Sequence, residues 1–183
     1  MSGHHLILGE LKDIISGETI DDTHDERLRQ KIARFLITVK GYLKVDIEPR
    51  RNLQVQAGKK RALIKIDFVI RIGGKAGLLI KYGPGSLVTR RRPALAASRL
   101  IESYQIPFVV VTNGKNAEII KGATGEVIGH GLESIPHRSA LADQLSIEDA
   151  DGISPKRAEM ESRIVYCYEV DGACPCDDNI CRL

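Results

Sequence analysis

The stretch RALIKIDFVIRIGGKAGLLIKYG, residues 61–83, decides the fold of this chain. Two apolar runs flank a pair of glycines, which supply the positive φ angles that a tight turn between strands needs. The pattern predicts a β-hairpin with strands at residues 61–71 and 76–82. Asp67 lies on the first strand and Lys81 on the second, so we expect the hairpin to bring the two side chains together.

Residues 21–40 predict an amphipathic helix. Apolar side chains such as Leu28, Ile32 and Leu36 recur at helical spacing, acidic residues gather in the first turn, and Gly41 follows the last turn. The other predicted elements are a strand at 42–48 closed by Pro49, a helix at 94–105 with Pro93 near its first turn, a buried strand at 106–114, edge strands at 117–122 and 125–130, and short helices at 139–149 and 155–166. This order predicts an α/β fold, a mixed β-sheet flanked by helices.

The positive charge of the chain is concentrated in its middle. The net charge is only +3, but residues 50–81 hold nine lysines and arginines against one aspartate, and residues 133–178 are net acidic. A basic middle with acidic flanks favours a localised anion-binding face. The alternative is an ordinary solvated run of charge.

The chain divides into three segments by composition. Residues 1–19 precede the first helix, residues 20–132 carry the predicted sheet and form the domain, and residues 133–183 form a C-terminal extension with short helices. No segment reaches the roughly 18 apolar residues that a membrane-spanning helix needs, and the N-terminus lacks the pattern of a signal peptide. We therefore expect a cytoplasmic protein with no membrane partner.

Four stretches, taken in order, resemble a known family. They are ERLRQ at 26–30, IDFVIR at 66–71, LLIK at 78–81 and IPFVVVTNG at 106–114. Together they are similar to the N-terminal domain of type I restriction enzyme R subunits (HsdR), a member of the PD-(D/E)xK nuclease superfamily, over residues 20–132. The resemblance implies a restriction-endonuclease-like fold in a free-standing relative. It also implies DNA, contacted through its phosphate backbone, and other restriction-system subunits as partners.

The resemblance also implies site residues for Mg²⁺-dependent phosphodiester hydrolysis. Asp67 would be the metal ligand, Lys81 the catalytic lysine, and Glu26 the acid of the first helix. A Mg²⁺ ion held by carboxylates activates water and neutralises phosphate oxygens, and a nearby lysine stabilises developing charge. On a helical wheel Asp25 lies closer than Glu26 to the apolar stripe, so Asp25 is the alternative first-helix acid.

The chain departs from the family pattern at two positions. Leu79 replaces the second metal-binding carboxylate, and Leu100 stands where relatives carry a glutamine four residues before a tyrosine, here Tyr104. Glu48 and Glu102 are candidates for an acid that has moved to a neighbouring element. Two hypotheses follow: a DNA-binding domain that hydrolyses DNA with a degenerate site, or an inactive module that binds nucleic acid or protein in a restriction or repair system.

The loop YGPGSLVTRRRP, residues 82–93, follows Lys81 directly. Glycines allow close approach of the backbone to a ligand, and amides at a helix start together with arginine side chains favour phosphate. We expect a phosphate-backbone clamp beside the site. The alternative is a flexible turn that leads into a basic helix start. The predicted DNA-binding residues are Ser86, Thr89, Arg90, Arg91 and Arg92.

All four cysteines lie near the C-terminus: Cys167, Cys174, Cys176 and Cys181. Four thiols this close together predict a Zn²⁺ site or an iron–sulfur cluster, although no paired C-x-x-C motif is present. Disulfides or free thiols are the alternative. We expect any such centre to hold the C-terminal extension together, away from the chemistry at Lys81.

Overall fold

The computed structural model describes residues 6–147, 151–171 and 180–183. The strands are β1 (Glu10–Lys12), β2 (Thr19–Asp21), β3 (Ile47–Ala57), β4 (Lys60–Ile72), β5 (Lys75–Tyr82), β6 (Phe108–Thr112), β7 (Ala117–Lys121), β8 (Val127–His130) and β9 (Ile180–Arg182). The helices are α1 (His24–Thr38), α2 (Val88–Ser98), α3 (Arg138–Ile147) and α4 (Pro155–Tyr166), with short turns η1 (Lys44–Asp46), η2 (Leu132–Ser134) and η3 (Cys167–Asp171).

Seven strands form one mixed sheet, which confirms the predicted fold class. The order is β3-β4-β5-β6-β7-β8, and β9 pairs with β4 beside β5. Strands β5 and β6 are parallel, and the other strand pairs seen in the described residues are antiparallel. The short β1–β2 pair forms a separate sheet. Among the described residues, no helix combines the length and hydrophobicity needed to cross a bilayer.

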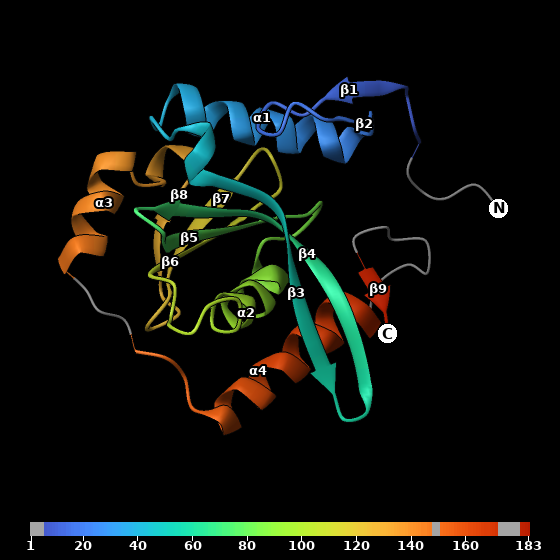
Figure 1. Ribbon diagram of the computed structural model, residues 1–183, viewed down its shortest axis with the longest axis vertical. Helices are drawn as coiled ribbons and strands as arrows, with labels where there is room; N and C mark the ends of the chain where they lie inside the picture. Colours follow the sequence, from blue (N-terminus) through green and yellow to red (C-terminus); the bar gives the residue numbers. More distant parts are fainter. Residues whose placement is uncertain (1–5, 148–150, 172–179) are drawn as a thin grey trace.

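Two apolar cores lie on opposite faces of the large sheet. One core contains side chains of α2, α4 and η3, and the other contains side chains of α1 and α3 (Figure 1). Val165, Tyr166 and Val170, from the C-terminal part of the chain, are buried in the first core. The sheet therefore lies between two helical layers, and α4 and η3 pack on the same face of the sheet as α2.

The β3–β4 pair changes the face that it buries close to Asp67. Alternate residues of a strand normally share a face, but Ile66 packs in the core of α2 and α4 whereas Phe68 packs in the core of α1 and α3. Arg50 of β3 stands opposite Asp67 and has a φ of 52°, which a non-glycine residue adopts when its surroundings hold it there. Asp67 therefore lies where the strand passes from one core to the other.

Two predicted boundaries are wrong. The strand expected at 42–48 begins at Ile47 and continues through Pro49, after the turn η1. Pro49 does not end it because β3 is the edge strand of the sheet, where a residue without an N–H group is tolerated. The helix expected at 94–105 covers Val88–Ser98 instead, so the three arginines lie inside its first turns and Pro93 lies inside the helix.

Candidate active site

The hairpin places Asp67 and Lys81 directly across from each other. Phe68 pairs with Ile80 in the antiparallel register, so the next positions along the two strands face each other. Both residues are buried, at 6% and 9% exposure, and Lys81 Nζ lies 3.9 Å from Asp67 Oδ2. The structure therefore brings together the two residues on which the sequence prediction was centred.

Both carboxylate oxygens of Asp67 already have partners. Oδ1 accepts a hydrogen bond from Arg29 Nε at 2.6 Å, and Oδ2 accepts one from the backbone N–H of Tyr82 at 2.8 Å. Arg29 also stacks over the Tyr82 ring, with 5.2 Å between its guanidinium carbon and the ring centre. The aspartate is thus fixed in place by α1 and by its own hairpin.

Helix α1 delivers both candidate acids to the site. Glu26 is buried, and its carboxylate accepts hydrogen bonds from Arg50 Nη2 and Gln30 Nε2, each at 2.9 Å. Arg29 Nη1 lies 3.6 Å from Glu26 Oε2, so this arginine bridges Glu26 and Asp67. Asp25 accepts a hydrogen bond from the Tyr82 hydroxyl at 2.8 Å.

The side chain of Arg50, whose backbone has a positive φ angle, forms two ion pairs. Besides Glu26, its guanidinium pairs with Asp13, with 2.5 Å between Nη1 and Oδ2. Burial alone would raise the pKa of Asp13, but hydrogen bonds from Arg50 and from the amides of Ile15 and Ser16 outweigh burial and lower it. The segment before α1 is therefore tied to the site through Arg50, which the sequence reasoning missed.

Lys81 has a third partner, which comes from the C-terminal part of the chain. Its ammonium lies 3.1 Å from Glu169 Oε2 of η3 and donates to the backbone carbonyl of Lys65 at 3.3 Å. Burial alone would lower the pKa of Lys81, but the carboxylates of Glu169 and Asp67 raise it above its usual value. Lys81 is therefore held charged between two carboxylates.

The acids considered as replacements for the missing carboxylate do not contact Asp67 or Lys81 in the structure. Leu79 is fully buried in the apolar core of α2. Glu48 pairs with Arg71 at 3.1 Å, and Glu102 also contacts Arg71. Both candidate replacements therefore neutralise an arginine farther along β4.

The second departure from the family pattern lies just beyond α2. The Tyr104 hydroxyl accepts a hydrogen bond from the Ala76 amide at 2.6 Å and donates one to the Ala76 carbonyl at 3.3 Å. Leu100 packs against the apolar core. Tyr104 thus holds the start of β5, at the end of that strand distant from Lys81.

The three arginines of the predicted phosphate clamp all have partners within the chain. Arg90 donates to the Pro84 carbonyl at 2.7 Å. Arg91 forms two hydrogen bonds with Glu118, at 2.5 and 2.6 Å, and Arg92 lies 2.6 Å from Glu161. Ser86 and Thr89 are exposed, and Thr89 donates to the Ser86 carbonyl at 3.3 Å. In this arrangement the hydroxyls face solvent, while the guanidinium groups connect α2 to its neighbours.

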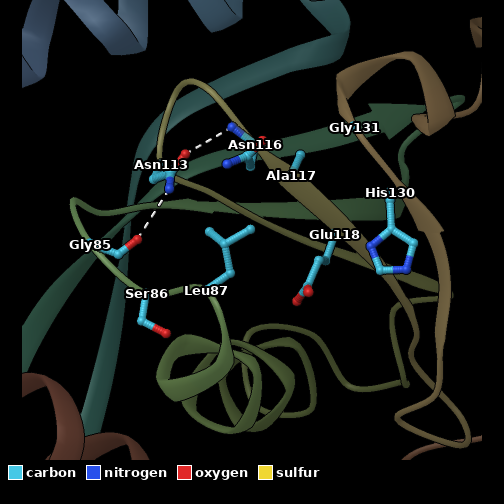
Figure 2. A pocket seen from close by; sticks show the side chains of 9 residues that line it. All are labelled: Gly85, Ser86, Leu87, Asn113, Asn116, Ala117, Glu118, His130 and Gly131. Atoms are coloured by element: carbon cyan, nitrogen blue, oxygen red, sulfur yellow. Dashed lines mark hydrogen bonds between the residues drawn. The ribbon is translucent and has the colours of Figure 1, made fainter.

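A cleft of about 440 Å³ opens beside this loop, where the parallel strands β5 and β6 end (Figure 2). Its lining residues are Gly85, Ser86, Leu87, Asn113, Asn116, Ala117, Glu118, His130 and Gly131. Asn113 fixes its shape by donating to the Gly85 carbonyl at 3.1 Å and accepting from the Asn116 amide at 2.8 Å. Neither Asp67 nor Lys81 lines the cleft, so the cleft and the charged site are separate.

The side chain of Lys81 contacts oxygen atoms of Asp67, Glu169 and the Lys65 carbonyl. Mg²⁺ is commonly held by one or two carboxylates, with water and phosphate oxygens in the remaining positions, so these residues fit the ion in kind. Within residues 6–147, 151–171 and 180–183, no three His, Cys, Asp or Glu side chains are grouped around one metal position. Any Mg²⁺ at Asp67 would therefore depend on few carboxylates and on the substrate itself.

The four-cysteine metal centre is not supported by the part of the chain that is described. Cys167 and Cys181 are exposed and free, while Cys174 and Cys176 lie outside the described residues. The described C-terminal segment contacts the rest of the molecule through buried apolar side chains, the ion pairs of Glu161 and Glu169, and the pairing of β9 with β4.

Comparison with known proteins agrees with the resemblance in the sequence. Residues 24–136 match the family model described as type I restriction enzyme R protein N terminus, and this match covers more than half of the chain. No curated protein and no solved structure shows significant similarity to it. The match contains α1, the β4–β5 hairpin and β6, and it ends before α4 and Glu169. The chain therefore belongs to the family of type I restriction enzyme R protein N-terminal domains.

Proposed function

We propose that this restriction-enzyme-related domain binds DNA through the phosphate backbone and hydrolyses a phosphodiester bond at Asp67 and Lys81. The observation that carries the proposal is the register of the β4–β5 hairpin, which sets a buried carboxylate and a buried ammonium face to face. The family match supports it, because the match spans both residues and Glu26. Other subunits of a restriction system are the proposed protein partners.

Each residue has a role that follows from its charge and contacts. Lys81, kept protonated by two carboxylates, would stabilise negative charge that develops on a phosphate oxygen. Glu26 would act through Arg29, which positions Asp67 by holding Oδ1. Asp67 would hold Mg²⁺, which, when bound, activates water and neutralises phosphate charge.

The β3–β4 hairpin offers the cations for backbone contact. Lys59, Lys60 and Arg61 at its tip are exposed, and no ion pair joins them to any carboxylate within the described ranges. The clamp arginines already have partners in the chain, whereas the exposed residues Ser86 and Thr89 offer hydroxyl groups to phosphate. We therefore place the main electrostatic contact on the hairpin.

Salt dependence tests this placement. Replacing the three hairpin cations with alanine should reduce the slope of log K against log salt for a short duplex by up to about 2.7, about 0.9 for each phosphate contact removed. Fluorescence anisotropy at several salt concentrations gives the slope. A variant with alanine at Lys115, Lys121 and Lys156, exposed cations elsewhere, has the same charge and serves as the control. Equal slopes for the two variants would remove the hairpin from the interface.

Plasmid nicking tests hydrolysis. The wild-type protein should nick supercoiled plasmid with Mg²⁺ or Mn²⁺ and lose this activity with a chelator. Asp67→Asn keeps the shape of the side chain but removes its charge, and we expect nicking to fall about 100-fold, as for removal of one strong electrostatic group. Equal activity of wild type and variant, with or without metal, would assign the nicking to a contaminant and reject the proposal.

A second function is favoured by one specific arrangement. Arg29 already neutralises Asp67, and position 79 is a buried leucine, so the site is electrostatically satisfied without a metal ion. A domain of this kind would bind DNA without cutting it. Duplex binding with the expected salt slope, together with absence of nicking in both metals, would select this function.

A further inference from the structure

Of the acids in the described part of the chain, the one nearest to Lys81 comes from outside the family match. Glu169 lies in η3, which follows α4, whereas the match ends at residue 136. Its carboxylate lies 3.1 Å from Lys81 Nζ, closer than the 3.9 Å between that nitrogen and Asp67. Two carboxylates, one from β4 and one from the C-terminal segment, therefore meet at a single ammonium group.

We propose that Glu169 is the second carboxylate of the active site and supplies the acid that position 79 does not. The inference rests on the proposed function, since it assigns a new residue to that same site. One carboxylate holds Mg²⁺ weakly because the ion gives up its water reluctantly, whereas two carboxylates with substrate phosphate are a common arrangement. Asp67 and Glu169, with Lys81 between them, provide those two groups.

The fold holds Glu169 at this place from both sides. Before it, Val165 and Tyr166 of α4 are buried in the core, and after it Val170 is fully buried. The backbone carbonyl of Val170 accepts a hydrogen bond from Arg182 of β9, the strand that pairs with β4. The turn itself is π-helical, a wide backbone form that often occurs at functional sites. Glu169 is therefore fixed by the core rather than carried on a free tail.

Partial exposure makes the carboxylate available to a ligand. The Glu169 side chain is 19% exposed, compared with 6% for Asp67 and 11% for Lys81. The other acids near β4 are committed elsewhere, since Glu48 and Glu102 both contact Arg71. Among the described carboxylates, Glu169 thus combines contact with Lys81 and access from solvent.

Titration with Mn²⁺ alone, by isothermal calorimetry on the full chain, tests the assignment. Wild type should bind the ion, and Asp67→Asn and Glu169→Gln should each weaken binding about tenfold or more. Glu169→Asp, which keeps the charge, should recover part of the affinity. Glu159→Gln is the matched control, because Glu159 lies on α4 and pairs with Arg163, and both side chains are more than half exposed. Far-ultraviolet circular dichroism checks that each variant is folded.

The outcomes separate the inference from the function on which it rests. If Asp67→Asn loses Mn²⁺ while Glu169→Gln binds like wild type, Glu169 is not a ligand, and the proposed function stands without it. If wild type binds no Mn²⁺ and nicks no plasmid, both are overturned. If Glu169→Gln does not fold, Glu169→Asp and Lys81→Met decide together. Wild-type affinity of Glu169→Asp for Mn²⁺ supports a carboxylate ligand only if Lys81→Met also binds Mn²⁺ within about tenfold of wild type. If Lys81→Met binds more weakly than that, the contact between Glu169 and Lys81 is structural and the inference is rejected.

Discussion

Replacing Arg29 with methionine should lower the free energy of unfolding by about 3 kcal/mol in metal-free buffer, the low end for removing one partner of a buried ion pair. The side chains of Arg29 and Asp67 are 17% and 6% exposed, so solvent screens their contact little. Methionine keeps most of the apolar volume, and the loss therefore reports charge. Urea denaturation measures it.

Metal ions should reverse much of this loss. Removing the guanidinium leaves Asp67 Oδ1 without its hydrogen-bond donor, and a bound divalent ion would replace the lost positive charge. A ligand present at about 100 times its dissociation constant adds about 2.7 kcal/mol to the stability of the folded state. Saturating Mn²⁺ should therefore stabilise Arg29→Met more than wild type, in which the arginine competes with the ion.

Arg27→Met provides the control on the same helix. Arg27 pairs with Asp22, but its side chain is 54% exposed, so we expect a much smaller loss than for Arg29→Met and no extra response to Mn²⁺. An Arg29→Met protein as stable as the control variant would show that the bridge between Asp67 and Glu26 contributes little. Equal stabilisation of all three proteins by Mn²⁺ would place the ion elsewhere.

Local patterns in the sequence were enough for the elements that carry the site. The helix predicted at 21–40 is observed at His24–Thr38, and the glycine pair forms the predicted turn between β4 and β5. Both depend on contacts between near neighbours. The strand through Pro49 was missed because its tolerance for proline depends on its place at the sheet edge, which is a property of the whole sheet.

The contacts that define the site are less local than the elements. Arg29 was visible in the sequence, three residues after Glu26 and so on the same side of the helix, but its contact with Asp67 spans 38 residues. Glu169 follows Lys81 by 88 positions and lies in a segment with no pattern that relates it to β5. The packing of α4 against β3 and α2, and of η3 against β4, brings this carboxylate to the lysine.

The domain boundary that the sequence predicts at residue 133 stays a prediction. We propose instead that α4, which lies beyond that boundary, forms one folding unit with residues 20–132. The support is Glu161 of α4, which is fully buried and contacts three arginines. Its partners are Arg92 of α2, Arg99 directly after α2 and Arg157 of α4, at 2.6 to 2.7 Å. This cluster anchors the helix that leads to Glu169.

Glu161→Gln should therefore lower the free energy of unfolding at pH 7 by about 3 kcal/mol, because it leaves arginine charge near a buried neutral group. Burial alone would raise the pKa of Glu161, but hydrogen bonds from Arg157, Arg92 and Arg99 outweigh it and lower the pKa below 4.5. A carboxyl group whose pKa is lower in the folded than in the unfolded protein stabilises the fold at pH values above the unfolded-state pKa. This stabilisation is lost as the pH falls through the folded-state pKa. Hence the difference between wild type and variant should shrink below about pH 4.5.

Urea denaturation of both proteins between pH 7 and pH 3 measures this convergence. Glu159→Gln on the same helix is the control: Glu159 and Arg163 are more than half exposed, so we expect a change below about 0.5 kcal/mol at every pH. A gap between wild type and Glu161→Gln that stays constant with pH would mean that shape, not charge, holds α4 in place. The gap in stability closing at low pH, together with weaker Mn²⁺ binding by Glu161→Gln than by wild type at pH 7, would show that the Glu161 cluster and the metal site are coupled. The coupling would run through the segment that carries Glu169.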